Sequence, residues 1–236
     1  IGNVCLENSN SKAEYEKLLL DYLDVNSVHL RENSLKALYC LGNPEAIKEA
    51  YVRLSAMDKQ HSEKLMSDGL MNGYKGDRNK LFDVMIDSFD DLLECYQDAV
   101  VTFMFRENNH TYDEFLKKYL SSNNNSMDLQ CAIIRLIGKD CSEENGVFFA
   151  DYMNNMDEEK YWEGIAVVAN VLGNFTRTEY IASTLCHALT SKFWYIRMNS
   201  AKALCKIGIN DDDIEKVKEM NDKYASEALM FAVNNI

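Results

Sequence analysis

Apolar and small residues recur along this chain at the spacing of one helix face. Ser34, Leu38 and Leu41 lie three or four positions apart, and this period places their side chains on a single side of an α-helix. The pattern returns along the sequence, and each time a short polar turn and a second amphipathic stretch follow it. It therefore predicts an all-α protein built from helix pairs.

The predicted helices fall into two sets that alternate along the chain. We expect the first helix of each pair at residues 29–41, 60–72, 91–105, 127–137, 158–172 and 194–207. We expect the second helices at 45–56, 77–89, 112–120, 143–153, 177–189 and 211–220. Residues 11–23 and 223–234 are expected to form half-units at the two ends, which makes residues 1–236 one repetitive domain.

Two segments far apart in the sequence are close copies of each other. Residues 31–42 and 197–208 share seven of twelve positions and start 166 residues apart, which is five steps of about 33 residues. Two intermediate copies end at Gly138 and Gly173, whereas the copy at 99–105 lacks its glycine. A glycine just after a helix readily adopts the left-handed conformation that ends the helix, so each glycine predicts a helix end.

The shared line Arg-x-x-Ser-x-x-Ala-Leu-x-x-Leu/Ile-Gly resembles the first helix of HEAT repeats. It is most similar to the short bacterial repeats that are also seen in phycobilisome-lyase-type proteins. The resemblance implies an α-solenoid, a right-handed superhelix of about six HEAT-like helix pairs with a groove lined by the second helices. In the family an aspartate usually stands six residues before the arginine. Here Val25 and Ser191 occupy those places, so the family's Asp–Arg ladder does not carry over.

Composition agrees with an all-α fold, and the net charge indicates which classes of partner the protein can bind. Pro44 is the only proline, where an average composition of about 5% would supply roughly a dozen. The net charge is −13, from 38 carboxylates against 25 basic residues. Proteins that grip nucleic acid usually concentrate Lys and Arg. The charge therefore disfavours nucleic-acid binding and favours a soluble protein, or one with a basic partner.

The cysteines and the apolar runs bear on the compartment. Seven cysteines, an odd number, stand mostly among apolar residues with no CxxC pair, which is typical of small buried side chains in a reducing compartment. No run of 18 apolar residues occurs, so we expect a cytoplasmic protein without a span. The chain begins at Ile1 rather than at a methionine. A membrane tether that precedes it is therefore a further hypothesis.

Motifs for catalysis and metal binding are missing. The sequence has no HExxH, GxSxG or P-loop pattern, and its four histidines are scattered. We therefore expect no catalytic residues, no metal and no cofactor. Carboxylates gather in three groups that could bind a cation or act as acid and base, but helix capping and a solvated acidic edge explain them better. The groups are Asp83, Asp87, Asp90, Asp91, Glu94 and Asp98; Asp157, Glu158, Glu159 and Glu163; and Asp211, Asp212, Asp213 and Glu215.

One aromatic run is the candidate partner surface. Phe193, Trp194 and Tyr195 are adjacent, and three neighbouring side chains cannot all face one helix core. One or two of them should therefore be exposed, or should pack on the preceding unit. Trp and Tyr are typical interface anchors, although packing at the junction between units also explains the run.

Three hypotheses about function follow. The repeats and the acidic surface favour a non-enzymatic scaffold that binds another protein, and a basic or helical partner fits best. The alternative is an enzyme, because HEAT-like folds include a bacterial DNA glycosylase type and lyases that act on bilin attachment. The net charge and the missing motifs disfavour it. The third hypothesis is a membrane-tethered accessory domain. The last predicted unit also weakly resembles bacterial HEAT proteins that are tethered to a membrane.

Overall fold

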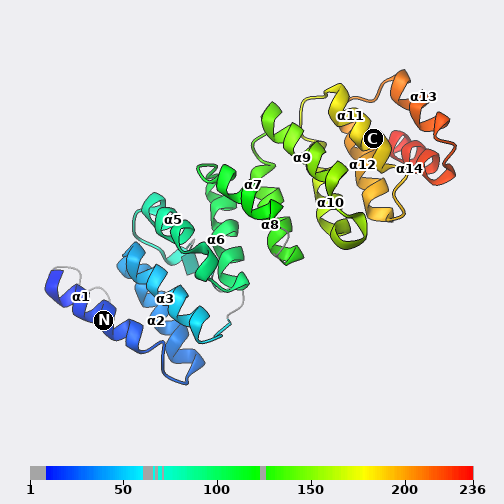
Figure 1. The fold of residues 1–236 in the computed structure, drawn as a ribbon. Coiled ribbons are helices and arrows are strands. Elements are labelled where there is room, and N and C mark those ends of the chain that lie inside the picture. The colour runs from blue at the N-terminus through cyan, green and yellow to red at the C-terminus, as the bar shows by residue number, and fades with distance from the viewer. Residues whose placement is uncertain (1–8, 61–65, 67–68, 71, 123–125, 236) are drawn as a thin grey trace. The chain divides into compact units, whose positions relative to one another are not determined.

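The computed structural model describes residues 9–60, 66, 69–70, 72–122 and 126–235 (Figure 1). Over these residues the chain forms thirteen α-helices and one short 3-10 helix, without any strand. The all-α class is therefore confirmed for the described part of the chain. The chain separates into two compact units, residues 1–112 and residues 113–236, and each is described by itself.

The N-terminal unit packs its helices in sequence order. Its elements are α1 (Ser9–Asp21), α2 (Val28–Leu41), α3 (Pro44–Ala56), α5 (Arg78–Asp87), the 3-10 helix η2 (Phe89–Asp91) and α6 (Glu94–Glu107). The first three contact one another, α3 packs on α5, and α5 packs on α6. Leu35, Ile47 and Phe82 are among the side chains buried between them, and removing such apolar surface from water is the main stabilising contribution to the unit.

The C-terminal unit has two rows of helices. Its elements are α7 (Asp113–Ser121), α8 (Met127–Ile137), α9 (Glu143–Asn155), α10 (Glu158–Leu172), α11 (Glu179–Ala188), α12 (Trp194–Ile207), α13 (Asp211–Glu219) and α14 (Lys223–Asn234). One row runs α8, α10, α12, α14, each helix in contact with the next, and the other runs α9, α11, α13 (Figure 1). Packing in this order is consistent with a helical repeat.

The predicted helix boundaries agree closely with the described ones. The segments 127–137, 158–172 and 194–207 coincide with α8, α10 and α12. The largest shift is at α6, which begins at Glu94 rather than at 91, because η2 ends at Asp91 and the next two residues are extended. The segment predicted at 60–72 lies mostly outside the described residues.

The glycines that follow the helices have two different structural roles. Gly42 and Gly208 have φ of 69° and 95°, so the predicted left-handed helix ends are confirmed there. The helices also end before Gly138 and Gly173, as predicted, but the predicted left-handed conformation is wrong there, because their φ values are −69° and −62°. These two glycines instead let neighbouring helices approach closely. A Cβ on Gly173 would lie 3.1 Å from the Cα of Ala203, tighter than ordinary packing allows.

The two similar segments share one structural device at the start of their helices. The Nη1 of Arg31 donates to the main-chain carbonyl of Val25 at 2.9 Å, and the Nη1 of Arg197 donates to that of Ser191 at 2.5 Å. Both acceptors stand six residues before their arginine. In both segments a backbone carbonyl is the acceptor, and the arginine ties the preceding turn to the helix.

Candidate functional site

The aromatic run that the sequence singles out lies at the start of α12. Phe193 is the N-terminal cap residue of this helix, and Trp194 and Tyr195 form its first turn. Trp194 and Tyr195 are each 57% exposed, whereas Phe193 is half-buried. Two of the three rings are therefore exposed, as the helical geometry predicts. Large aromatic side chains exposed together on a rigid element are typical of a contact surface.

Trp162 of α10 joins this run into one surface. Its ring stacks on Phe193 with centroids 5.6 Å apart and planes inclined by 8°, and on Tyr195 at 6.0 Å and 25°. Trp194 then meets Tyr195 edge to face at 5.0 Å. Both geometries are favourable for aromatic pairs. The predicted packing on the preceding helix is thus also present, and it holds the exposed rings in place.

A hollow of about 300 Å³ between α12 and α14 continues the surface. Its walls are Trp194, Arg197, Met198, Tyr224, Glu227, Ala228 and Phe231. The guanidinium of Arg197 lies over the ring of Tyr224, 5.4 Å from its centroid, in a cation–π contact. Tyr224 and Phe231 are 63% and 54% exposed. We call the side chains Trp162, Phe193, Trp194, Tyr195, Tyr224 and Phe231 the aromatic surface.

Half of the aromatic surface was missed by sequence reasoning. Trp162, Tyr224 and Phe231 belong to helices whose apolar positions are expected in the core. One signal was available, since Phe231 and Val233 are apolar residues in the last predicted half-unit. Trp162 gave no local signal, because its partner Phe193 lies 31 residues further along the chain.

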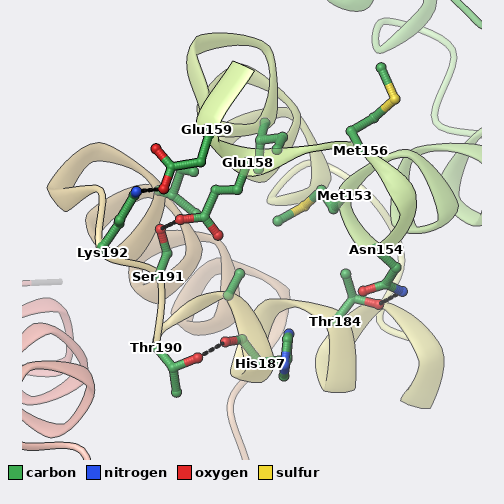
Figure 2. Close-up of a pocket in the computed structure, with 13 residues that line it drawn as sticks. Met153, Asn154, Met156, Glu158, Glu159, Thr184, His187, Thr190, Ser191 and Lys192 are labelled. Carbon is green, nitrogen blue, oxygen red and sulfur yellow. Dashed lines mark hydrogen bonds and ion pairs between the residues drawn. The ribbon is translucent and has the colours of Figure 1, made fainter. Parts of the chain in front are cut away.

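A second hollow, of about 430 Å³, opens among α9, α10, α11 and α12 (Figure 2). Met153, Ile165 and Ile196 contribute apolar walls, and polar residues line the rest. Figure 2 shows Glu158 and Ser191 pointing toward each other, and the Oγ of Ser191 donates to the Oε1 of Glu158 at 2.6 Å. Ser191 and Ile196 line this hollow, and Trp194 and Arg197 line the first. The start of α12 therefore separates the two hollows.

The carboxylate groups have structural partners. Asp157 caps α10 by accepting from the main-chain N–H of Glu159, and Asp213 belongs to a capping box at the start of α13. Asp83 accepts from the hydroxyl of Tyr112 at 2.5 Å; burial, followed by this hydrogen bond, raises the Tyr112 pKa above its ordinary value. No group of three His, Cys, Asp or Glu side chains suited to a metal occurs among the described residues. Capping thus explains Asp157 of the second group and Asp213 of the third.

The cysteines differ in burial, and the prediction that most are buried is wrong for the two segments on which it rested. Cys40 is exposed and Cys205 is half-buried, as is Cys95, and Cys141 is exposed. Cys131 and Cys186 are buried, and Cys5 lies outside the described residues. Next to Cys40 in α2, Leu38, Tyr39 and Leu41 are buried, so Cys40 points away from the core although its neighbours are apolar.

The thiols are expected to react at very different rates. In a chain with Cys5→Ser, Cys40 and Cys141 are expected to react with a thiol-specific reagent first, at about pH 8. Cys131 and Cys186 are expected to react only when the chain unfolds, because burial shields them and raises the pKa of Cys186 to about 11. Mass mapping of the labelled cysteines in native and urea-unfolded chain checks this. Labelling of native Cys186 as fast as Cys40 would contradict it.

Comparison with known proteins does not assign a family. No protein-family model matches the sequence, and no curated protein matches it. The resemblance to HEAT repeats therefore stays a prediction. Among the described residues, none of the helices has both the length and the apolar character that crossing a bilayer requires.

Proposed function

We propose that this chain is a protein-binding module, an α-solenoid of about six HEAT-like pairs, that holds a basic partner segment on its aromatic surface. The observation that carries the proposal is the exposure of Trp194 and Tyr195, adjacent in one helix and each more than half exposed. A rigid pair of large aromatic side chains supplies contact area at little cost in side-chain entropy. No catalytic role is part of the proposal.

The hollow between α12 and α14 is where an apolar anchor of the partner would enter. Its volume of about 300 Å³ is at the lower end of the range in which small ligands are bound, so it suits one apolar side chain. Trp194, Tyr224 and Phe231 supply its exposed rings, and Arg197 lies over the ring of Tyr224. Such a pocket, surrounded by further contacts that exclude water, is typical of an interface hot spot.

Charge favours a basic partner. The chain carries a net charge of −13, and three carboxylates, those of Asp157, Glu158 and Glu159, start the helix that carries Trp162. A fourth, Glu227, lines the hollow beside the aromatic surface. Lys or Arg residues on either side of the partner's anchor would be attracted by this field, mostly through the association rate, and salt would weaken the effect.

The test is capture of a partner from source cells by the native chain and by the double variant Trp194→Ala/Tyr195→Ala. The double variant is expected to lose the partner, with affinity reduced at least about tenfold, and salt is expected to elute the partner from the native chain. Tyr180→Ala, which removes another exposed aromatic side chain of the same unit, is the control and should retain the partner.

Two results would contradict the proposal. The first is a partner that the double variant holds as tightly as Tyr180→Ala does. The second is binding that does not respond to salt, since the acidic field would then play no part. Nucleic acid in place of a protein in the eluate would instead favour the glycosylase-type alternative.

A further inference from the structure

The hollow among α9, α10, α11 and α12 contains a carboxylate without a cationic partner. Glu158 is half-buried and accepts a hydrogen bond from Ser191. No ion pair of Glu158 occurs among the described residues, whereas its neighbour Glu159 is paired with Lys192. The carboxylate that has no cation is therefore that of Glu158, and Lys192, which also lines the hollow, is paired with Glu159.

Hydrogen bonds hold the Glu158 carboxylate in position. The Oγ of Ser191 donates to it and accepts from the main-chain N–H of Phe193 at 3.0 Å, and Ser191 itself is buried. The carbonyl of Ser191 accepts from Arg197, so the segment before α12 is anchored on both sides. A carboxylate oriented in this way loses little freedom when a cation binds it.

The remaining walls suit a long side chain with a charged end. Met153, Met156, Ile165 and Ile196 contribute apolar surface, against which an aliphatic stem can pack while its charged head reaches the carboxylate. An anion would meet the charge of Glu158. An apolar group would cover that carboxylate without pairing it, which is costly.

We infer that this hollow binds a lysine or arginine side chain of the partner segment, next to the apolar anchor that the aromatic surface receives. The inference rests on the proposed function and adds the partner's chemistry to it. The start of α12 separates the two hollows. A helix with its side chains is about 10–12 Å across, and an extended chain rises about 3.3 Å per residue. The basic residue and the anchor are therefore expected about three or four residues apart.

The first experiment tests the hollow without the partner. The isotope-labelled full chain is titrated with Nα-acetyl-arginine amide and with its neutral analogue Nα-acetyl-citrulline amide, followed by NMR. The arginine probe is expected to shift the signals of residues such as Thr184 and Ile196, and the citrulline probe at least about tenfold less at equal concentration. Equal shifts from the two probes, or no shifts in the hollow, would overturn the inference.

Two variants then separate charge from folding. Glu158→Gln keeps the shape of the side chain and is expected to weaken binding of the arginine probe about tenfold. Glu163→Gln makes the same charge change at an exposed position of the same helix that does not line the hollow, and is expected to bind like the native chain. If the two variants bind the probe equally well, the inference is wrong. Urea unfolding midpoints of Glu158→Gln and Glu163→Gln, measured alongside, check that both variants are folded.

The captured partner distinguishes this inference from the function on which it rests. Suppose that Trp194→Ala/Tyr195→Ala loses the partner, whereas Glu158→Gln and Glu163→Gln bind the partner with equal affinity. That result would overturn the inference and leave the proposed function standing. A partner that the double variant retains overturns the proposed function, even where the arginine probe still binds beside Glu158. If Trp194→Ala/Tyr195→Ala and Glu158→Gln each lose the partner while Glu163→Gln retains it, the result supports the proposed function and the inference.

Discussion

Replacing Asp213 by alanine is expected to lower the free energy of unfolding by about 3–5 kcal/mol, the range measured when one partner of a buried ion pair is removed. Asp213 is fully buried. Its carboxylate lies 3.2 Å from the Nη2 of Arg177 and accepts from the main-chain N–H of Asn210 at 3.1 Å. One side chain thus ties the turn before α11 to the start of α13.

Two separate losses contribute to this effect. The substitution leaves the main-chain N–H of Asn210 without its capping acceptor, which costs about 1 kcal/mol. It also leaves the guanidinium of Arg177, whose side chain is 18% exposed, with the exposed carboxylate of Glu179 as its one remaining ion-pair partner among the described residues. A charge that is mostly removed from water and has lost its buried partner accounts for the larger share of the cost.

Urea unfolding followed by circular dichroism measures the change. Asp212→Ala is the matched control, because it removes an exposed carboxylate one residue earlier in the same first turn and is expected to change stability by at most about 0.5 kcal/mol. Adding Arg177→Met to Asp213→Ala should recover part of the loss, since the uncompensated charge is then removed as well. Equal unfolding midpoints for the Asp212 and Asp213 variants would contradict the prediction.

Helix boundaries were predictable because the signals for them are local. Periodicity marks the buried face, and a side-chain cap stands before many of the helices, as Ser126 does before α8 and Thr178 before α11. These interactions span three or four residues, so a single sequence contains them. The copy at 99–105, which has no glycine after its helix, also has a local signal. Its helix α6 ends at Asn108, whose φ is 53°. This asparagine adopts the left-handed conformation that Gly42 and Gly208 adopt after their helices.

The candidate site was only partly predictable, because its remaining members depend on contacts distant in the sequence. Three adjacent rings on a helix imply that one or two of them are exposed or pack on the preceding unit, but not that Trp194 and Tyr195 are the exposed ones. The stacking of Trp162 on Phe193 depends on how α10 packs against α12. The hollow beside Glu158 needs four helices to form it, and nothing in the local pattern distinguishes Glu158 from the exposed carboxylates around it.

Replacing Gly42 by alanine is expected to cost about 2–5 kcal/mol, the sum of backbone strain and overpacking. Its φ of 69° lies in the left-handed region, where a Cβ costs about 1–2 kcal/mol. A Cβ would also lie 2.5 Å from the main-chain nitrogen of Gly76 and 2.9 Å from its Cα. Because that neighbour is backbone, it cannot turn aside as a side chain can, and the turn before α3 would have to move.

Gly208→Ala separates these two contributions. Gly208 stands at the equivalent position of the other copy with φ of 95°, and nothing lies within 4 Å of the Cβ that a substitution would add. Its substitution is therefore expected to cost only the strain, about 1–2 kcal/mol. Unfolding of both variants in urea gives the difference, which measures how tightly Gly42 packs on Gly76. If Gly42→Ala were no more destabilising than Gly208→Ala, the close approach of the two backbones would contribute nothing, and the left-handed helix end alone would explain why both copies carry a glycine there.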